Sequence, residues 1–214
     1  MQTNWKKTAG LLASAGVAVT GVLVSSGPAS AAVTATTTTT TPYVCQTRVS
    51  GGWIPVDYSR DFTVTAPATV APNKTFKVTF DSAPINAVAA YNKTLTDVKI
   101  AYRVPAGATV VSYWLSGGSA NLGGNQWVER HGDTLVVRSG DDFQGGVAYD
   151  LPNLEVVLRA PGSGTLTTGP AGTGFTDPSF YWYRLQPTTN EWDPFQCYMD
   201  PAAPVVFSTT TVQP

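Results

Sequence analysis

Hydrolytic chemistry needs a nucleophile with its base or a pair of carboxylates, and the sequence offers few candidates for either. The only histidine, His131, is followed by Gly132-Asp133, which predicts a tight turn in place of a catalytic triad. No Gly-x-Ser-x-Gly elbow is present. Asp141 and Asp142 are adjacent, so on a strand their side chains would face opposite ways. We therefore predict a non-enzymatic protein, with a small secreted hydrolase as an alternative because carboxylates from distant segments could still meet.

The sequence also contains few residues that could bind a metal ion or a cofactor. Two cysteines and one histidine are too few for a structural zinc site or a cofactor cage. Asp141 and Asp142, with Asp133 or Asp150, could offer oxygen ligands to Ca²⁺, but their spacing matches no EF-hand loop. Asp residues that bond their own backbone in turns are commoner. We expect no metal and no cofactor.

Aromatic side chains are the most suggestive binding groups. Residues 180–183 read Phe-Tyr-Trp-Tyr, and residues 192–195 read Trp-Asp-Pro-Phe. On a strand, Tyr181 and Tyr183 would share one face and the other two rings the opposite face, so one pair is core and the other half exposed. Exposed rings beside Asp and Asn are typical of sugar- and protein-binding faces, although rings also fill a two-sheet core and cap its ends. The predicted binding residues are Trp182, Tyr183, Trp192 and Phe195.

The first 31 residues have the layout of a secretory signal peptide. Lys6 and Lys7 precede an apolar run over 9–24, and Ala29-Ser30-Ala31 offers small side chains for cleavage after residue 31. A membrane anchor is the alternative, but this run is shorter than the roughly 20 residues that span a bilayer. No later stretch approaches that length. We predict a secreted, extracellular protein without a membrane span in the mature chain, with association with the cell envelope left open.

Charge and cysteine content fit an exported protein. The 13 basic and 14 acidic residues almost cancel, so the positive field of a nucleic-acid binder is missing. Exported thiols meet an oxidising environment, and Cys45 and Cys197 are the only pair. We predict that they form one disulfide, which ties the first strand to one of the last.

Alternation of apolar and polar residues predicts the elements that position these groups. Short runs rich in Val, Thr and aromatic residues recur about every ten residues between Gly, Pro, Asn and Asp clusters. The clearest are 62–66 and 76–80, which alternate in hydrophobicity. No segment has convincing helical periodicity. The Thr-rich stretch 32–42 has little to bury and predicts a disordered linker. The irregular stretch 140–178 could hide a ligand pocket.

One stretch carries a family resemblance. Residues 62–80, Phe-Thr-Val-Thr-Ala-Pro-Ala-Thr-Val-Ala-Pro-Asn-Lys-Thr-Phe-Lys-Val-Thr-Phe, resemble the opening hairpin of bacterial immunoglobulin-like extracellular domains, with Asn73 where Gly is commoner. An early Cys, the Val104-Pro105 pair and a late Cys give a layout similar to secreted single-domain actinobacterial proteins of uncharacterised function. The resemblance implies fold and location, and it supplies no catalytic residues.

Together these features predict an all-β protein, an immunoglobulin-like antiparallel β-sandwich with one disulfide, over residues 43–214. The predicted function is that of a secreted, non-enzymatic extracellular or cell-envelope binding or structural protein. Its partner would be an extracellular protein or a glycan. A carbohydrate-binding module that uses exposed Trp and Tyr rings is the alternative.

Overall fold

Residues 33–214 are described by the computed structural model, and the signal peptide predicted over 1–31 lies outside them. Within the described residues the chain forms strands and no helix, because β-branched and aromatic residues favour the pleated conformation. None of these residues belongs to a helix with the length and hydropathy of a membrane span. The strands are β1 (Thr34–Val49), β2 (Gly52–Pro67), β3 (Thr69–Val70), β4 (Thr75–Ser82), β5 (Ile85–Asn86), β6 (Thr94–Arg103), β7 (Thr109–Ser116), β8 (Gln126–His131), β9 (Thr134–Ser139), β10 (Phe143–Gln144), β11 (Ala148–Tyr149), β12 (Asn153–Arg159), β13 (Gly164–Pro170), β14 (Phe180–Leu185), β15 (Trp192–Met199) and β16 (Ser208–Val212).

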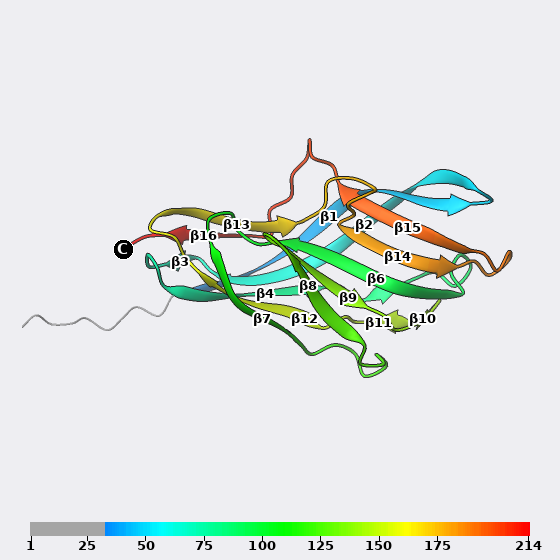
Figure 1. The fold of residues 1–214 in the computed structure, drawn as a ribbon, viewed down its shortest axis with the longest axis horizontal. Coiled ribbons are helices and arrows are strands. Elements are labelled where there is room, and N and C mark those ends of the chain that lie inside the picture. Colours follow the sequence, from blue (N-terminus) through cyan, green and yellow to red (C-terminus); the bar gives the residue numbers. More distant parts are fainter. Residues whose placement is uncertain (1–32) are drawn as a thin grey trace, which may run out of the picture. The chain divides into compact units, whose positions relative to one another are not determined.

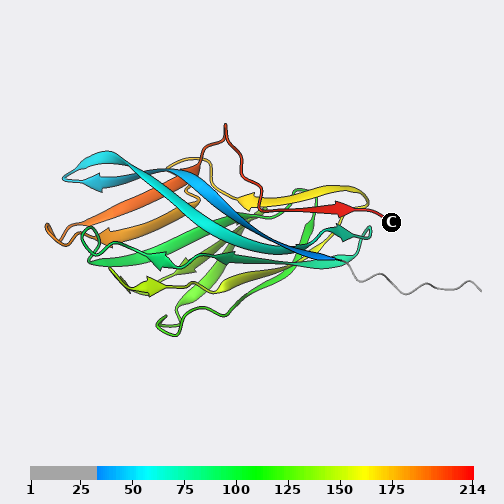
Figure 2. The same ribbon diagram turned by 180° about the vertical axis from the view of Figure 1, so that it is seen from behind.

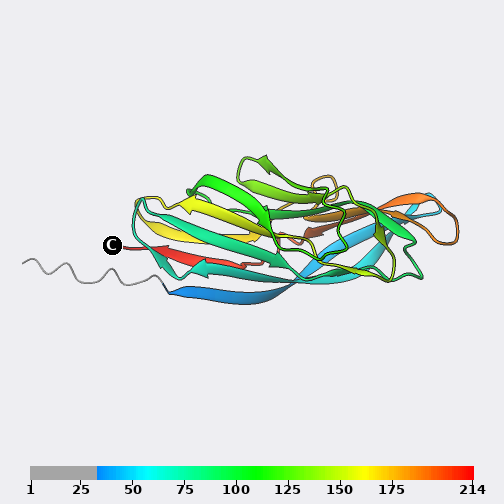
Figure 3. The same cartoon turned by 90° about the horizontal axis from the view of Figure 1, so that it is seen from below.

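These strands form two layers that pack face to face (Figure 1). One layer, here called the β14 sheet, contains β15, β14, β6, β9 and β8, and the other, the β4 sheet, contains β2, β4, β12 and β7. Within residues 33–214 all strand pairings are antiparallel except that of β16 with β3. Figure 3 shows β16 in red beside the labelled C-terminus. The predicted all-β antiparallel sandwich is confirmed.

The long hairpin of β1 and β2 joins the two layers. The two strands pair along their whole length, from Thr34 opposite Pro67 to Val49 opposite Gly52. The second half of β1 pairs with β15, whereas the second half of β2 pairs with β4. Figure 2 shows this hairpin in blue to cyan, running from one layer to the other. The end of the hairpin at Gly52 is therefore attached to the β14 sheet and is not paired with the β4 sheet.

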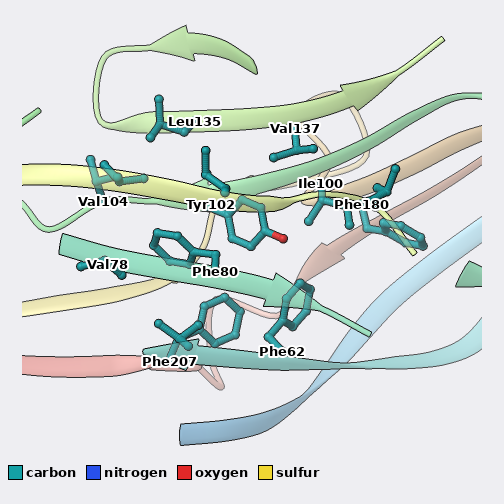
Figure 4. Packing of buried hydrophobic residues seen from close by; sticks show 14 of the residues in the cluster. Phe62, Val78, Phe80, Ile100, Tyr102, Val104, Leu135, Val137, Phe180 and Phe207 are labelled. Carbon is teal, nitrogen blue, oxygen red and sulfur yellow. The ribbon is translucent and has the colours of Figure 1, made fainter. Parts of the chain in front are cut away.

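The core lies between the layers and is rich in rings. Phe80 and Val78 of β4 are fully buried, as alternation predicts for one face of a half-buried strand. Tyr102 of β6 packs edge-on against Phe62 at 5.9 Å and lies 4.8 Å from Phe80, measured between ring centroids (Figure 4). Phe207 closes the cluster against Phe62 at 4.8 Å. Ring-to-ring contacts therefore connect both layers.

The predicted disulfide is present. Cys45 of β1 and Cys197 of β15 are direct register partners, with Cα atoms 4.1 Å apart and a sequence separation of 152. Both are buried. The bond therefore fastens the layer-crossing hairpin to the β14 sheet.

The prediction of a disordered linker over 32–42 is wrong for residues 34–42, which form the first half of β1. Their polarity does not prevent pairing, because Thr is β-branched and the outward face of an outer strand tolerates hydroxyls. Thr36 and Thr38 hydrogen-bond to Thr65 and Thr63 across the ladder, each at 2.9 Å. The domain accordingly begins near residue 34, and the prediction of a domain starting at residue 43 placed its boundary too late.

Two predicted turns are confirmed by backbone geometry. Gly132, with a φ of +63°, joins β8 to β9 as a tight hairpin. Asn73, which stands where the resembling hairpins carry Gly, also adopts a positive φ of +61°. Asn tolerates this left-handed region better than most residues, so the turn before β4 keeps its conformation without glycine.

Candidate functional site

The four residues predicted for binding fall into two pairs on opposite faces of the β14 sheet. Trp182 and Phe195 point inward and are each 5% exposed, whereas Tyr183 and Trp192 point outward and are 36% and 42% exposed. The expected alternation along 180–183 is confirmed. The expectation that Trp182 and Phe195 contribute exposed rings is wrong, because both pack into the interior, and no single surface contains all four residues.

The inward pair forms the floor of a pocket. The Trp182 and Phe195 rings stack with centroids 4.5 Å apart, and Tyr58 packs edge-on against both, at 6.0 and 5.4 Å. The pocket has a volume of about 610 Å³. Its lining residues are Thr47, Val49, Ile54, Val56, Asp57, Tyr58, Asn86, Ala87, Val88, Ala90, Tyr91, Asn92, Trp182, Arg184, Gln186, Pro187, Thr188 and Phe195.

The position of the pocket follows from the unequal lengths of the layers. The β1–β2 and β14–β15 hairpins extend past the end of β4 (Figure 1), and their residues line the pocket together with residues of the segment 86–92. The inner face of the β14 sheet is thus incompletely covered at this end. The stretch 140–178, expected to be irregular and to hide a pocket, contains β10 to β13 and contributes no lining residue.

Arg184 forms part of the pocket wall and is only 8% exposed. Its terminal nitrogens donate to the carbonyl oxygens of Tyr91 and Arg48, at 3.0 and 3.3 Å. Burial lowers the pKa of the guanidinium, and the negative charge of Asp193 opposes that effect. Nothing in the residue spacing predicted this group, because a single Arg in an aromatic strand reads as an exposed charge.

The outward pair belongs to a group of rings on the other face of the β14 sheet. The Tyr183 and Trp192 rings are nearly parallel, at 9° with centroids 6.0 Å apart. Tyr181 continues the row, 6.5 Å from Tyr183 at an angle of 24°. Burial, together with Asp97 and Tyr183, raises the pKa of the Tyr181 hydroxyl to about 12, so this hydroxyl is neutral at physiological pH.

A second row runs across four adjacent strands of the same face. Tyr181, Lys99, Arg138 and Trp127 are successive register partners on β14, β6, β9 and β8. The Lys99 ammonium lies 4.6 Å from the Tyr181 ring centroid, and the Arg138 guanidinium lies 5.3 Å from that of Trp127. These are cation–π distances, so each cation of the row lies against a ring, with the two cations between the two rings.

Carboxylates hold the cations of this row in place. Arg138 forms ion pairs with Asp97 at 2.5 Å and with Glu129 at 2.8 Å, and Lys99 pairs with Asp97 at 3.0 Å. The indole of Trp127 also donates to Glu129, and this bond, with those from Arg138, lowers the pKa of the Glu129 carboxyl against the effect of burial. We call the surface made by the exposed rings of Trp127, Tyr183 and Trp192 and the half-buried side chains of Arg138, Lys99 and Tyr181 the aromatic face.

The remaining polar groups have local structural contacts. His131 is exposed at its hairpin, with Nε2 3.6 Å from Glu129. Asp141 accepts hydrogen bonds from the Gly123 amide, at 2.7 Å, and from the Gln126 side chain, which fixes the β7–β8 loop. Across residues 33–214 there is no cluster of three or more His, Cys, Asp or Glu arranged to hold a metal ion.

Solved structures show what the fold is similar to. No protein-family model and no curated protein matches the chain significantly. The crystal structure of a Corynebacterium diphtheriae protein, provisionally described as membrane anchored, matches with a TM-score of 0.50 and 18% identity over 83% of this chain. The seventh ScaB type I cohesin from Pseudobacteroides cellulosolvens has a TM-score of 0.39 and 10% identity, covering 68% of this chain and 86% of the cohesin. The chain spans 38% of the length of the Corynebacterium protein, and the likeness at 18% identity concerns the fold alone.

Proposed function

We propose that this chain is an extracellular, non-enzymatic binding module that recognises a protein partner through the aromatic face. The observation that carries the proposal is the composition of that face. Trp, Tyr and Arg are the side chains enriched at the energetic centres of protein interfaces, and here they lie on adjacent strands of one sheet.

The stiffness of the aromatic face supports binding. Arg138 is held between two carboxylates and over a ring, and Tyr183 rests against Trp192. Side chains that are already ordered lose less conformational entropy when a partner docks. The face is therefore preorganised, and little of the interaction free energy is spent on ordering it.

The chemistry of the described residues favours binding over catalysis. The one histidine is exposed and lies beside a carboxylate that also holds Arg138 and Trp127. A catalytic base is usually oriented by a third group next to a nucleophile, whereas the contact that His131 makes is with the Glu129 carboxylate. Extracellular location rests on the signal-like residues 1–31 and on the disulfide, which is stable in an oxidising compartment.

A glycan is the second candidate partner, favoured by a different observation. Tyr181, Tyr183 and Trp192 have nearly parallel planes with centroid spacings of 6.5 and 6.0 Å. Planar apolar rings with hydroxyl and indole donors suit a flat, hydroxyl-rich chain. In this alternative the cations of the aromatic face would contribute little.

The test compares Trp192→Ala with Trp114→Ala. Both indoles are exposed to almost the same extent, 42% and 43%, but Trp114 belongs to β7 in the other layer. Immobilised wild type and each variant are presented with purified cell-envelope proteins, soluble polysaccharides and insoluble cell wall. We expect saturable binding of a protein that weakens about tenfold or more in Trp192→Ala and is unchanged in Trp114→Ala.

The outcomes separate the candidates. Binding of a polysaccharide that Trp192→Ala abolishes and that competing sugar displaces would replace the protein partner with a glycan. Equal effects of the two variants would contradict a role for the aromatic face. Turnover of any polysaccharide by wild type would overturn the non-enzymatic assignment.

A further inference from the structure

The pocket at the end of the sandwich is chemically unlike the core that it extends. Its floor is apolar, made by the stacked Trp182 and Phe195 rings, and its rim exposes Ile54, Val88 and Tyr91 at 45%, 57% and 66%. Apolar side chains on both the floor and the rim favour an apolar ligand body. This site lies on the opposite face of the β14 sheet from the aromatic face, so the inference does not depend on the proposed function.

A buried cation lies in the wall of this apolar space. Arg184 is only 8% exposed, and no carboxylate among residues 33–214 lies within 4.0 Å of its guanidinium. It donates only to two backbone carbonyls, and its Nε has no hydrogen-bond partner among these residues. Buried charges in proteins are normally paired, and the buried Asp193 carboxylate on the neighbouring strand offsets the charge of Arg184 only from beyond 4.0 Å.

Among residues 33–214, Arg184 is the only cation that lines the pocket. Asp193 is its register partner on β15, but the Asp193 carboxylate accepts a hydrogen bond from Gln186 and does not line the pocket. Asp57 lines the pocket on an exposed stretch of β2. An anionic head would therefore be attracted at the Arg184 wall and repelled on the Asp57 side, which orients it.

We propose that this pocket binds a fatty acid, with its carboxylate on Arg184 and its alkyl chain over the Trp182 and Phe195 rings. The guanidinium supplies charge-assisted hydrogen bonds to the head, and the aromatic floor removes the chain from water. The volume of about 610 Å³ lies within the roughly 300–1,000 Å³ typical of small-molecule sites.

The experiment titrates the mature chain with decanoate by isothermal calorimetry. Decyltrimethylammonium carries the same chain with a cationic head, acetate carries the same head without the chain, and N-acetylphenylalanine carries a carboxylate on a peptide-like body. We expect one saturable site for decanoate, with the other three compounds binding at least about tenfold more weakly. Stronger binding of N-acetylphenylalanine would overturn the fatty acid in favour of a peptide C-terminus.

Variants test the head and the chain separately. Arg184→Gln removes the charge but keeps a donor for the neighbouring carbonyls, and we expect it to weaken decanoate about tenfold, whereas Arg184→Lys retains more of the affinity. Ala90→Trp places a bulky ring in the lining and should abolish binding, while Ala106→Trp, at an exposed turn outside the lining, should not. Equal binding of decanoate and decyltrimethylammonium, or wild-type affinity in Ala90→Trp, would overturn the proposal. Because Ala90 is exposed, that variant reports on the pocket even if Arg184 variants fold poorly.

Discussion

Single polar side chains in this sandwich are held by several partners at once. Glu155, on the outer side of β12, accepts hydrogen bonds from Thr79 at 2.7 Å and Ser116 at 3.1 Å and pairs with Lys77 at 3.0 Å. Burial alone would raise the pKa of this carboxyl, but the bonds from Thr79, Lys77 and Ser116 lower it below its ordinary value. The ionised form is therefore favoured by folding.

The acid limb of the stability profile should reflect Glu155. A carboxyl whose folded pKa is lowered stabilises the fold above its unfolded pKa, ordinarily 4.5, and loses that contribution as pH falls through the folded pKa. We expect urea unfolding to show wild type more stable than Glu155→Gln at pH 7, with the difference shrinking as pH falls below about 4. A difference that stays constant with pH would contradict the assignment. The raised pKa values of Asp81 and Asp150 act in the opposite direction and cancel in the comparison.

Arg60 is a buried charged residue that makes several polar contacts. Only 4% exposed, it donates to the Tyr58 hydroxyl, the Ser82 hydroxyl and the Ala83 carbonyl, and its guanidinium lies 4.9 Å from the Phe180 ring centroid. A planar fork is needed to make these contacts together.

Replacing the Arg60 guanidinium with an ammonium group should destabilise the fold although the positive charge is kept. We expect Arg60→Lys to lower the free energy of unfolding by about 2 kcal/mol, because hydrogen bonds to the buried partners are lost. Arg130→Lys, at an exposed position of β8, should change it by less than about 0.5 kcal/mol in the same denaturation assay. Equal midpoints for the two variants would show that the Arg60 contacts contribute little.

At the scale of elements, the first half of β1 decides whether the β4 sheet has its outer strand. Residues 34–42 pair with residues 59–67 of β2, and Thr41 is completely buried. Without this strand the backbone groups of β2 on that side would lose their ladder partners, and buried groups near Thr41 would meet water.

Shortening the chain tests this element. A chain that begins at Tyr43 should have a free energy of unfolding lower by about 3 kcal/mol or more than that of a chain that begins at residue 32. Several ladder hydrogen bonds, each contributing about 1 kcal/mol, are lost with residues 32–42. As a control, Thr36→Val and Thr38→Val together retain β-branched side chains and should change the midpoint little. Identical urea midpoints for the two chain lengths would restore the view of residues 32–42 as a linker.

At the scale of the whole molecule, one covalent bond closes nearly the entire described chain. Cys45 and Cys197 enclose a loop with a sequence separation of 152, and they join the layer-crossing hairpin to the β14 sheet. Unfolding with the bond intact leaves a constrained denatured chain of low entropy.

Removing this disulfide should lower the free energy of unfolding more than the single substitutions considered above. On the chain-entropy model, Cys45→Ala with Cys197→Ala lowers the free energy of unfolding by about 5 kcal/mol. The urea midpoint of the double variant, compared with oxidised wild type, measures the effect. A loss below about 1 kcal/mol would mean that the denatured chain is already compact without the bond.

Local patterns were sufficient where one physical rule decides the outcome. Alternation along 62–66, 76–80 and 180–183 determined which side chains face inward, because successive residues of a strand point to opposite sides. The sole cysteine pair determined the disulfide, and the Gly132 turn determined its hairpin.

Tertiary structure alone decided the strand at 34–42 and the two candidate binding surfaces. The Thr-rich composition of residues 34–42 predicts disorder because it includes few large apolar side chains to bury. In the fold, however, β2 supplies the backbone hydrogen-bond partners of these residues. Likewise, the sequence determined that rings cluster near residues 182 and 195, whereas the pocket exists because two hairpins extend beyond the opposite layer. The row from Tyr181 to Trp127 depends on register between strands that are far apart in sequence, and no local pattern specifies such pairing.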